Sequence, residues 1–183
     1  KPLINYQLAI LKSCHIDNIN VISGYKNGEI PTKDINIFIN QNYASTNMVY
    51  SLFCAQEVLN SNDDILLCYG DILFTKELLE NLAHKNHEIN VAVDTEWRSY
   101  WESRMSNPLE DAETLKLDSK ENILEIGKKT NSYKDIHAQY IGLIKIRSDI
   151  AKKLLDIYQE LDTEIYYDGN SFSQMYMTTF IQH

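Results

Sequence analysis

The sequence has 183 residues, 44% of them hydrophobic, and a formal net charge of -9 from 26 acidic and 17 basic residues. This length and apolar content allow one domain with a substantial core, while the lack of any apolar run of about eighteen residues argues against a membrane span. The acidic balance disfavours nucleic-acid and anionic-membrane partners, because both select a basic surface. We therefore expect a cytoplasmic protein that acts on a small or magnesium-complexed ligand.

The first half of the chain alternates helical and strand patterns. Apolar residues recur at helical spacing in Leu3–Cys14 and in Met48–Leu59, where Ser45, Thr46 or Asn47 is the candidate cap, and a third helix is expected from about Thr75 in "TKELLENLAH". The expected strands are "INVISGY", "INIFIN", "DILLCYG" and "INVAVD". Strands that read as continuous apolar runs between helices predict an α/β fold with a mainly parallel sheet and helices on both faces.

After Asp94 the rhythm changes. The segments "AETLKLD" and "NILEIG" predict a hairpin, and "AQYIGLIKI" predicts a further strand. A helix capped by Ser148 and a final helical segment, Ser171–Gln182, should follow. We interpret residues 1–183 as one domain, in which residues 95–138 form an inserted region that faces the substrate.

An acid directly after a buried strand is the most informative local feature. Asp71 follows "DILLCYG" and Asp94 ends the next strand. In open parallel sheets, ligands bind at the carboxyl ends of strands, and a carboxylate placed there can hold Mg²⁺ together with nucleotide phosphates. Asp71 could equally cap the helix that starts near Thr75, and the pattern alone leaves both interpretations open.

Three stretches of the first half resemble a known family. The strings "KPLINYQLAILKSCHIDNINVISGY", "NQNYASTNMVYSLFCAQ" and "LLCYGDILF" are similar, in order and spacing, to segments of the nucleotidyltransferases that include sugar-phosphate nucleotidylyltransferases and bacterial phosphocholine cytidylyltransferases. The second half is similar to a narrower branch, which includes cytidylyltransferases that activate phosphoglutamine for capsule decoration. The resemblance implies a Rossmann-related, GT-A-like fold.

The resemblance also implies roles for individual residues. Asp71 matches the family's metal ligand, and Asn47, Tyr69 and Gly70 would contact the nucleotide. In "EIGKK", Lys128 takes the place of the catalytic lysine that contacts the acceptor's phosphate, with Lys129 as its neighbour.

Two parts of the family pattern are not in these residues. The family's Gly-rich loop normally precedes "KPLI", and its second metal-binding Asp normally follows the final helix. The expectation is that the chain is a trimmed form of a longer enzyme and that these 183 residues alone show little turnover.

The acceptor site is expected in the inserted region. Its aromatic and charged residues, with a tyrosine from the following strand, are candidate acceptor contacts: Trp97, Trp101, Arg104, Glu110, Asp111, Glu113 and Tyr140. Aromatic rings and carboxylates suit an amine, and arginine suits a carboxylate or phosphate, so an amino-acid phosphate such as phosphoglutamine is favoured. The alternative for Trp97 and Trp101 is that they form one apolar helix face in the core.

The leading hypothesis is a Mg²⁺-dependent transfer of CMP from CTP to a small phosphorylated acceptor. The alternatives are a sugar-1-phosphate nucleotidylyltransferase that uses UTP or dTTP, a GT-A glycosyltransferase, and a non-catalytic regulatory domain. A glycosyltransferase of that type typically presents two acids at the strand end, whereas "YGDI" has one. Oligomeric state is left open, and a homo-oligomer is allowed.

Overall fold

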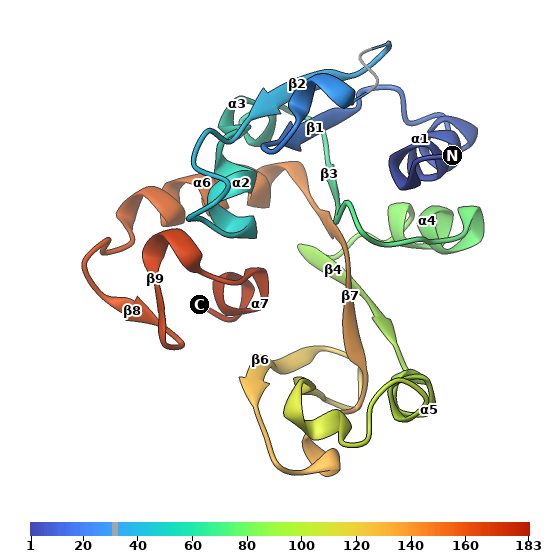
Figure 1. Ribbon diagram of the computed structural model, residues 1–183, viewed down its shortest axis with the longest axis vertical. Coiled ribbons are helices and arrows are strands. Elements are labelled where there is room, and N and C mark those ends of the chain that lie inside the picture. Colours follow the sequence, from blue (N-terminus) through green and yellow to red (C-terminus); the bar gives the residue numbers. More distant parts are fainter. Residues whose placement is uncertain (31–32) are drawn as a thin grey trace.

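The centre of the molecule is a three-stranded sheet in the order β3–β7–β4. The computed structural model describes residues 1–30 and 33–183. Strand β7 (Gln139–Ile146) pairs antiparallel with β3 (Ile65–Cys68) and with β4 (Ile89–Asp94), so β3 and β4 run in the same direction (Figure 1). A separate pair, β1 (Asn20–Ser23) and β2 (Asn36–Ile39), is parallel. The α/β class is confirmed. Among the described strands, β1 and β2 form a parallel pair, whereas both pairings of the central sheet are antiparallel because β7 runs opposite to β3 and β4.

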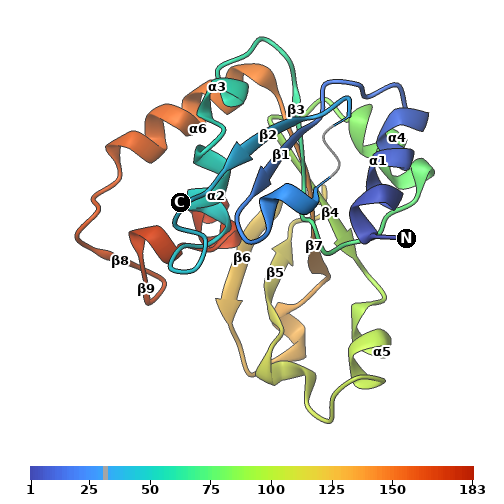
Figure 2. The ribbon, with the colours of Figure 1, turned by 45° about the horizontal axis from the view of Figure 1, so that its top comes forward.

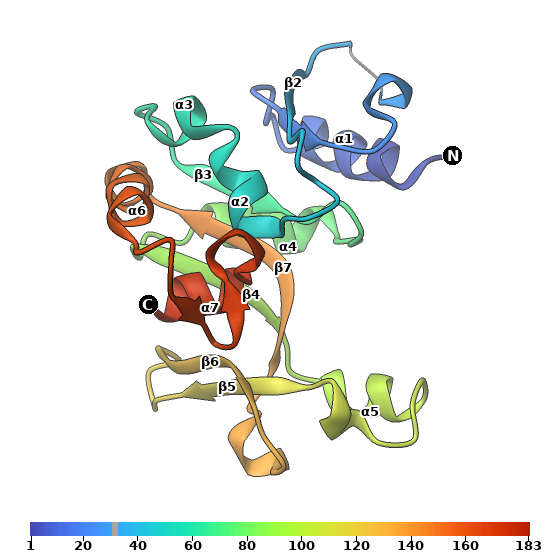
Figure 3. The ribbon, with the colours of Figure 1, turned by 60° about the vertical axis from the view of Figure 1, so that its left-hand side comes forward.

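Helices cover both faces of the central sheet, as expected. One face carries α1 (Leu3–Ser13) and α4 (Lys76–Ala83), and the other carries α2 (Met48–Phe53), α6 (Ser148–Glu160) and α7 (Met177–Gln182) (Figures 1 and 3). Side chains alternate along β3 to serve both: Ile65 and Leu67 pack toward α6, whereas Leu66 and Cys68 pack toward α1 and α4. This two-sided burial explains why the strand reads as a continuous apolar run.

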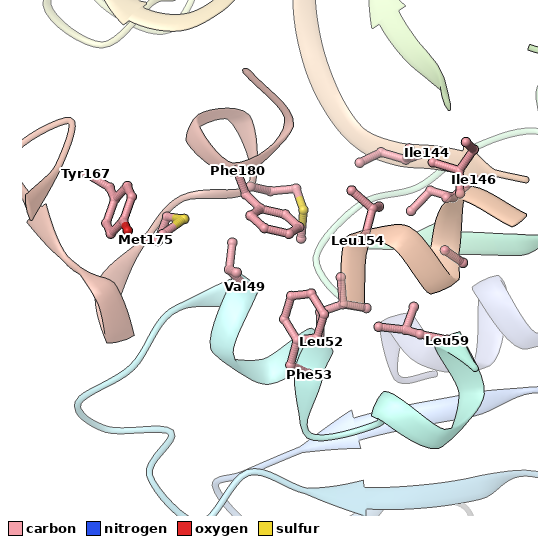
Figure 4. Close-up of a cluster of buried hydrophobic side chains, with 13 residues drawn as sticks. Val49, Leu52, Phe53, Leu59, Ile144, Ile146, Leu154, Tyr167, Met175 and Phe180 are labelled. Carbon is pink, nitrogen blue, oxygen red and sulfur yellow. The ribbon is translucent and has the colours of Figure 1, made fainter. Parts of the chain in front are cut away.

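The larger core lies under α2, α6 and α7. Figure 4 shows Val49 and Leu52 of α2 directed toward Phe180 of α7 and Leu154 of α6. Phe53 stacks on Tyr158 with ring centroids 3.7 Å apart. Each large apolar side chain removed from water contributes about 1.5–3 kcal/mol. This core fixes the start of α2 and the whole of α7 against the sheet.

Two predicted helices differ in detail. The expected helix over Met48–Leu59 is interrupted at Cys54 and Ala55 and continues as α3 (Gln56–Leu59). Of the three candidate caps, Asn47 is the N-cap of α2, and its side chain accepts the backbone N–H of Met48 at 2.9 Å.

The expected Ser148 cap is wrong. Ser148 is the first residue of α6, and its backbone N–H donates instead to Asp64 Oδ1 at 3.0 Å. The final segment is helical only in α7, because a small hairpin, β8 (Tyr166–Tyr167) and β9 (Asn170–Ser171), and a short turn come first. The first difference depends on a contact with a segment 84 residues away, whereas the second reflects a local hairpin.

The expected hairpin in residues 95–138 is present between β4 and β7. The region begins with α5 (Trp97–Glu102). The hairpin itself consists of β5 (Glu113–Leu117) and β6 (Ile123–Lys129), which are antiparallel (Figure 2). The 3₁₀ turns of the described chain are η1 (Asn27–Glu29), η2 (Pro108–Glu110), η3 (Tyr133–Asp135) and η4 (Phe172–Gln174). Helix α7 packs against β6, where the Gln182 side chain accepts the N–H of Ile126 at 2.9 Å. The hairpin is thereby tied to the main core.

A large cavity separates β1 from β3. Its volume is about 880 Å³, and α1 and both strands line it, with Leu11, Val21 and Leu66 among the apolar residues. Within residues 1–30 and 33–183, β1 and β3 belong to different sheets and are not paired with each other. In the same residues, none of the helices is both long and apolar enough to cross a bilayer.

Candidate functional site

Asp71 lies in the loop that follows β3. The side chain of Thr75 caps α4 by accepting the N–H of Leu78 at 3.1 Å, so the alternative that Asp71 caps this helix is wrong. Asp71 is exposed, and its carboxylate makes no ion pair with any residue that the structure describes. The carboxylate is therefore available to a ligand.

A cavity of about 410 Å³ opens beside Asp71. Tyr69, Gly70 and Asp71 line it together with Met48 of α2 and Met177 of α7. The structure thus brings together three of the four residues that the resemblance connects with metal and nucleotide. We call this space the Asp71 cavity.

A buried glutamine that sequence reasoning missed holds the loop of the Asp71 cavity. The Gln7 side-chain amide donates to the carbonyl oxygens of Tyr69 at 2.7 Å and Ile72 at 2.8 Å, on either side of Gly70 and Asp71. Gln7 is 7% exposed. The signal in the sequence is a polar residue on the otherwise apolar face of α1.

Asn47 is occupied by structural contacts. Besides capping α2, its side-chain amide donates to the carbonyl oxygen of Gln174 at 3.4 Å. Asn47 does not line the Asp71 cavity, although its neighbour Met48 does. A nucleotide contact by Asn47 stays a prediction.

A second cavity, of about 170 Å³, lies between the β5–β6 hairpin, β7 and α7. Its lining includes Trp101, Asp111, Glu113, Gln139, Tyr140 and Thr178. Four of these were predicted as acceptor contacts, and the structure gathers them from three elements and a loop. We call this space the Glu113 cavity.

Other predicted acceptor residues lie outside the Glu113 cavity. Trp97 is 3% exposed and packs with Ala112 and Ile136. Its assignment as an acceptor contact is therefore corrected to a core role. Its ring contacts that of Trp101 edge-to-face, with centroids 5.8 Å apart. Arg104 lies over the exposed ring of Tyr100.

The remaining charged candidates sit on exposed surface. Glu110 accepts a hydrogen bond from Asn107, and the Lys128 ammonium lies 3.6 Å from Glu125. Lys129 is the register partner of Glu113 across the hairpin. Neither lysine lines either cavity, so their roles at a phosphate stay predictions.

The two cavities share a wall. Tyr69 of the Asp71 cavity and Tyr140 of the Glu113 cavity meet edge-to-face, with ring centroids 5.6 Å apart. On α7, the consecutive residues Met177 and Thr178 line the Asp71 cavity and the Glu113 cavity respectively. Because of these shared residues and contacts, ligands in the two cavities would be immediate neighbours.

The Tyr69 hydroxyl in this wall stays protonated more readily than a free tyrosine. Burial raises the pKa of Tyr69 to about 12, and the nearby charges of Asp71 and Glu113 add to the rise.

The ligand set around Asp71 suits a metal that brings most of its own ligands. In residues 1–30 and 33–183, no cluster of three or more His, Cys, Asp or Glu side chains could hold a metal ion. A single exposed carboxylate fits Mg²⁺, which keeps several waters and takes its remaining oxygens from substrate phosphates.

Comparison with known proteins connects this arrangement to one family. The model of the MobA-like NTP transferase domain matches residues 1–125. CTP:phosphoglutamine cytidylyltransferase of Campylobacter jejuni is 39% identical over 191 aligned residues, which cover 100% of this chain and 75% of that protein.

More distant relatives share parts of the chain or its fold. A bifunctional sugar-1-phosphate nucleotidylyltransferase/acetyltransferase of Sulfurisphaera tokodaii is 30% identical over 82% of this chain and 34% of its own length. The solved structure of the inositol-1-phosphate CTP transferase from T. maritima superposes with a TM-score of 0.69 at 16% identity, covering 98% of this chain and 66% of that one. The last comparison establishes the fold.

Proposed function

Since this chain belongs to the family of MobA-like NTP transferase domains, we propose that it transfers CMP from CTP to a small phosphorylated acceptor and releases pyrophosphate. The acceptor is phosphoglutamine or a similar amino-acid or amino-alcohol phosphate or phosphonate. Its product serves surface polysaccharide modification. The choice of CTP and of this acceptor class follows the name of the Campylobacter relative.

The observation that carries the proposal is the pair of adjoining cavities. The Asp71 cavity has its carboxylate beside the strand-end glycine, where a nucleotide phosphate can approach the backbone. The Glu113 cavity, across the wall of Tyr69 and Tyr140, has the size and the polar lining for one end of a small acceptor. Two substrates held side by side are what a group transfer between them requires.

The chemistry is an in-line displacement. An oxygen of the acceptor's phosphate forms a bond to the α-phosphorus of CTP, the bond from that phosphorus to the α,β-bridging oxygen breaks, and pyrophosphate leaves with the electron pair. A phosphate dianion has no proton to lose, so positioning and charge neutralisation matter more than a general base.

Asp71 would hold Mg²⁺, which when bound supplies positive charge at the triphosphate. Gln7 contributes by holding the backbone on both sides of Asp71. Tyr69, which lines the Asp71 cavity and contacts Tyr140, would lie between the two substrates. Lys128 remains the candidate cation for the acceptor's phosphate.

A sugar-1-phosphate acceptor with UTP or dTTP is the alternative, supported by the Sulfurisphaera relative. Sugar hydroxyls would bind beside two carboxylates without compensating their charge, whereas an amine would compensate it. We therefore favour the amine-bearing acceptor.

The test is pyrophosphate release by the protein expressed from its full coding sequence. CTP, UTP and dTTP are each paired with phosphoglutamine, phosphocholine and glucose 1-phosphate, with and without Mg²⁺. We expect turnover with CTP and phosphoglutamine, and a loss of roughly a hundredfold or more in Asp71→Asn. Asp63→Asn, at the opposite end of β3, is the matched control and should keep its activity. Preferred use of glucose 1-phosphate, or an unaffected Asp71→Asn variant, would rule out the proposal.

A further inference from the structure

The charges in the Glu113 cavity are not balanced by the protein. Asp111 and Glu113 both line it, and no Lys, Arg or His is among its described lining residues. Glu113 makes no ion pair with any described residue; its only side-chain hydrogen bond there comes from the Thr178 hydroxyl at 3.4 Å. Burial raises the pKa of the Glu113 carboxyl, and the opposing charge of Lys129 offsets this only in part. A half-buried carboxylate without a cation is costly unless a ligand supplies one.

The cavity also contains an unused hydrogen-bonding group. The Tyr140 hydroxyl oxygen is fully buried; the Tyr69 hydroxyl lies beside it, but in the described residues Tyr140 makes no hydrogen bond of good geometry. Buried hydroxyls without a partner are uncommon in native proteins. The orphaned hydroxyl is independent of the two acids, and it too calls for a ligand.

The neighbouring amide cannot satisfy these groups. Gln139 is 7% exposed, and its side-chain N–H groups donate to the carbonyl oxygens of Glu113 at 2.6 Å and Ala138 at 3.2 Å. Its donors are therefore directed at the backbone. The cavity offers two carboxylates and a phenol oxygen as acceptors, and its described lining has hydroxyl donors but no cationic donor.

We propose that the Glu113 cavity is a subsite for a primary ammonium group of the acceptor, held by Glu113 and Asp111 with the Tyr140 hydroxyl as a further hydrogen-bond acceptor. This inference rests on the proposed function and specifies which acceptors it takes. A primary ammonium has three N–H donors and one positive charge, which matches the acceptors present. A quaternary ammonium brings charge but no N–H donor, so it could contact the rings of Trp101 and Tyr140 but would leave the Tyr140 hydroxyl oxygen without a donor. A sugar hydroxyl brings no charge.

The test compares phosphoglutamine with its Nα-acetyl derivative, which differs at the amino group. In the wild-type protein, acetylation should raise the acceptor KM tenfold or more. Glu113→Gln should raise the KM for phosphoglutamine by a similar factor. It should leave the KM for the acetylated compound and the KM for CTP unchanged, so the variant should no longer distinguish phosphoglutamine from its acetylated derivative. Tyr140→Phe should act in the same direction with a smaller factor. Glu96→Gln, an equivalent change at an exposed site outside both cavities, is the matched control.

Direct binding separates this inference from the proposed function. Calorimetric titration of both compounds, without CTP, should show the same preference and its loss in Glu113→Gln even if no pyrophosphate is released. Equal binding of the two compounds by the wild-type protein overturns the inference, as does a Glu113→Gln variant that weakens both equally. Turnover without Glu113-dependent selectivity would support the proposed function and rule out the ammonium subsite.

Discussion

At the scale of single residues, we expect the ionised Glu113 carboxylate to lower the free energy of unfolding, even though it would help to bind the acceptor. Burial raises its pKa, with Asp111 and Asp168 adding to the rise and Lys129 opposing it. Ionising this carboxyl is thus harder in the folded protein than in the unfolded chain. The stabilisation from this preference is present below the ordinary glutamate pKa and is lost as pH rises through the raised value.

Glu113→Gln should therefore be at least as stable as the wild type at pH 7, and its relative stability should fall toward pH 4. The reason is that the neutral amide never bears the cost of a buried charge. Urea denaturation at pH 4, 5, 6 and 7 measures the free energy of unfolding of each protein. The control Glu96→Gln should show no such trend, and a Glu113→Gln deficit that is constant across pH would contradict the explanation.

Lys145 is a second buried charge, with a structural role. Its ammonium donates to the carbonyl oxygens of Ala83 at 2.8 Å and Lys85 at 2.6 Å, and it lies 3.0 Å from the Asp64 carboxylate. Lys145→Met removes all three contacts. We expect a loss of about 2 kcal/mol, since Asp64 is partly solvated and its ion pair counts for less.

Thermal and urea denaturation check this loss. Lys152→Met is the matched control, because Lys152 makes one exposed hydrogen bond, to Asn62, and its removal should change stability by less than about 0.5 kcal/mol. Equal losses in the two variants would show that the buried contacts of Lys145 contribute nothing.

At the scale of elements, the contact of α7 with the β5–β6 hairpin positions the Glu113 cavity. Gly127 in β6 has φ +84°, and a Cβ there would lie 2.5 Å from Thr178. Gly127→Ala should lower stability by about 1–3 kcal/mol through backbone strain and should displace Thr178 from the cavity. We expect the acceptor KM to rise severalfold.

Gly169→Ala separates strain from displacement. Gly169 has φ +83°, but a Cβ there would meet nothing within 4 Å. It should lose stability through strain alone and keep its acceptor KM. Steady-state kinetics with varied acceptor and saturating CTP measure the acceptor KM of both variants. An acceptor KM that rises equally in both would show that displacement of Thr178 on α7 is not the cause of the weaker acceptor binding.

The elements also show what the sequence can predict. Strands such as "DILLCYG" and the hairpin were predictable, because alternation and turn residues are local signals. The antiparallel position of β7 and the capping of α6 by Asp64 were not, because each depends on where a distant segment packs. At the site, Asp71 was indicated by its place after a strand, whereas Gln7, Gln139 and Thr178 acquire their roles only when remote elements meet.

At the scale of the whole molecule, the cavity between β1 and β3 leaves each of these strands with an edge that is unpaired within residues 1–30 and 33–183. Amide protons on such edges have no partner carbonyl to protect them from solvent. In hydrogen–deuterium exchange, the amides of β3 that face β7 should therefore be slow, and alternate amides of the same strand, which face the cavity, should be fast. An edge of this kind can also pair with an extended peptide, so protection gained there on adding one would test whether these edges accept a strand.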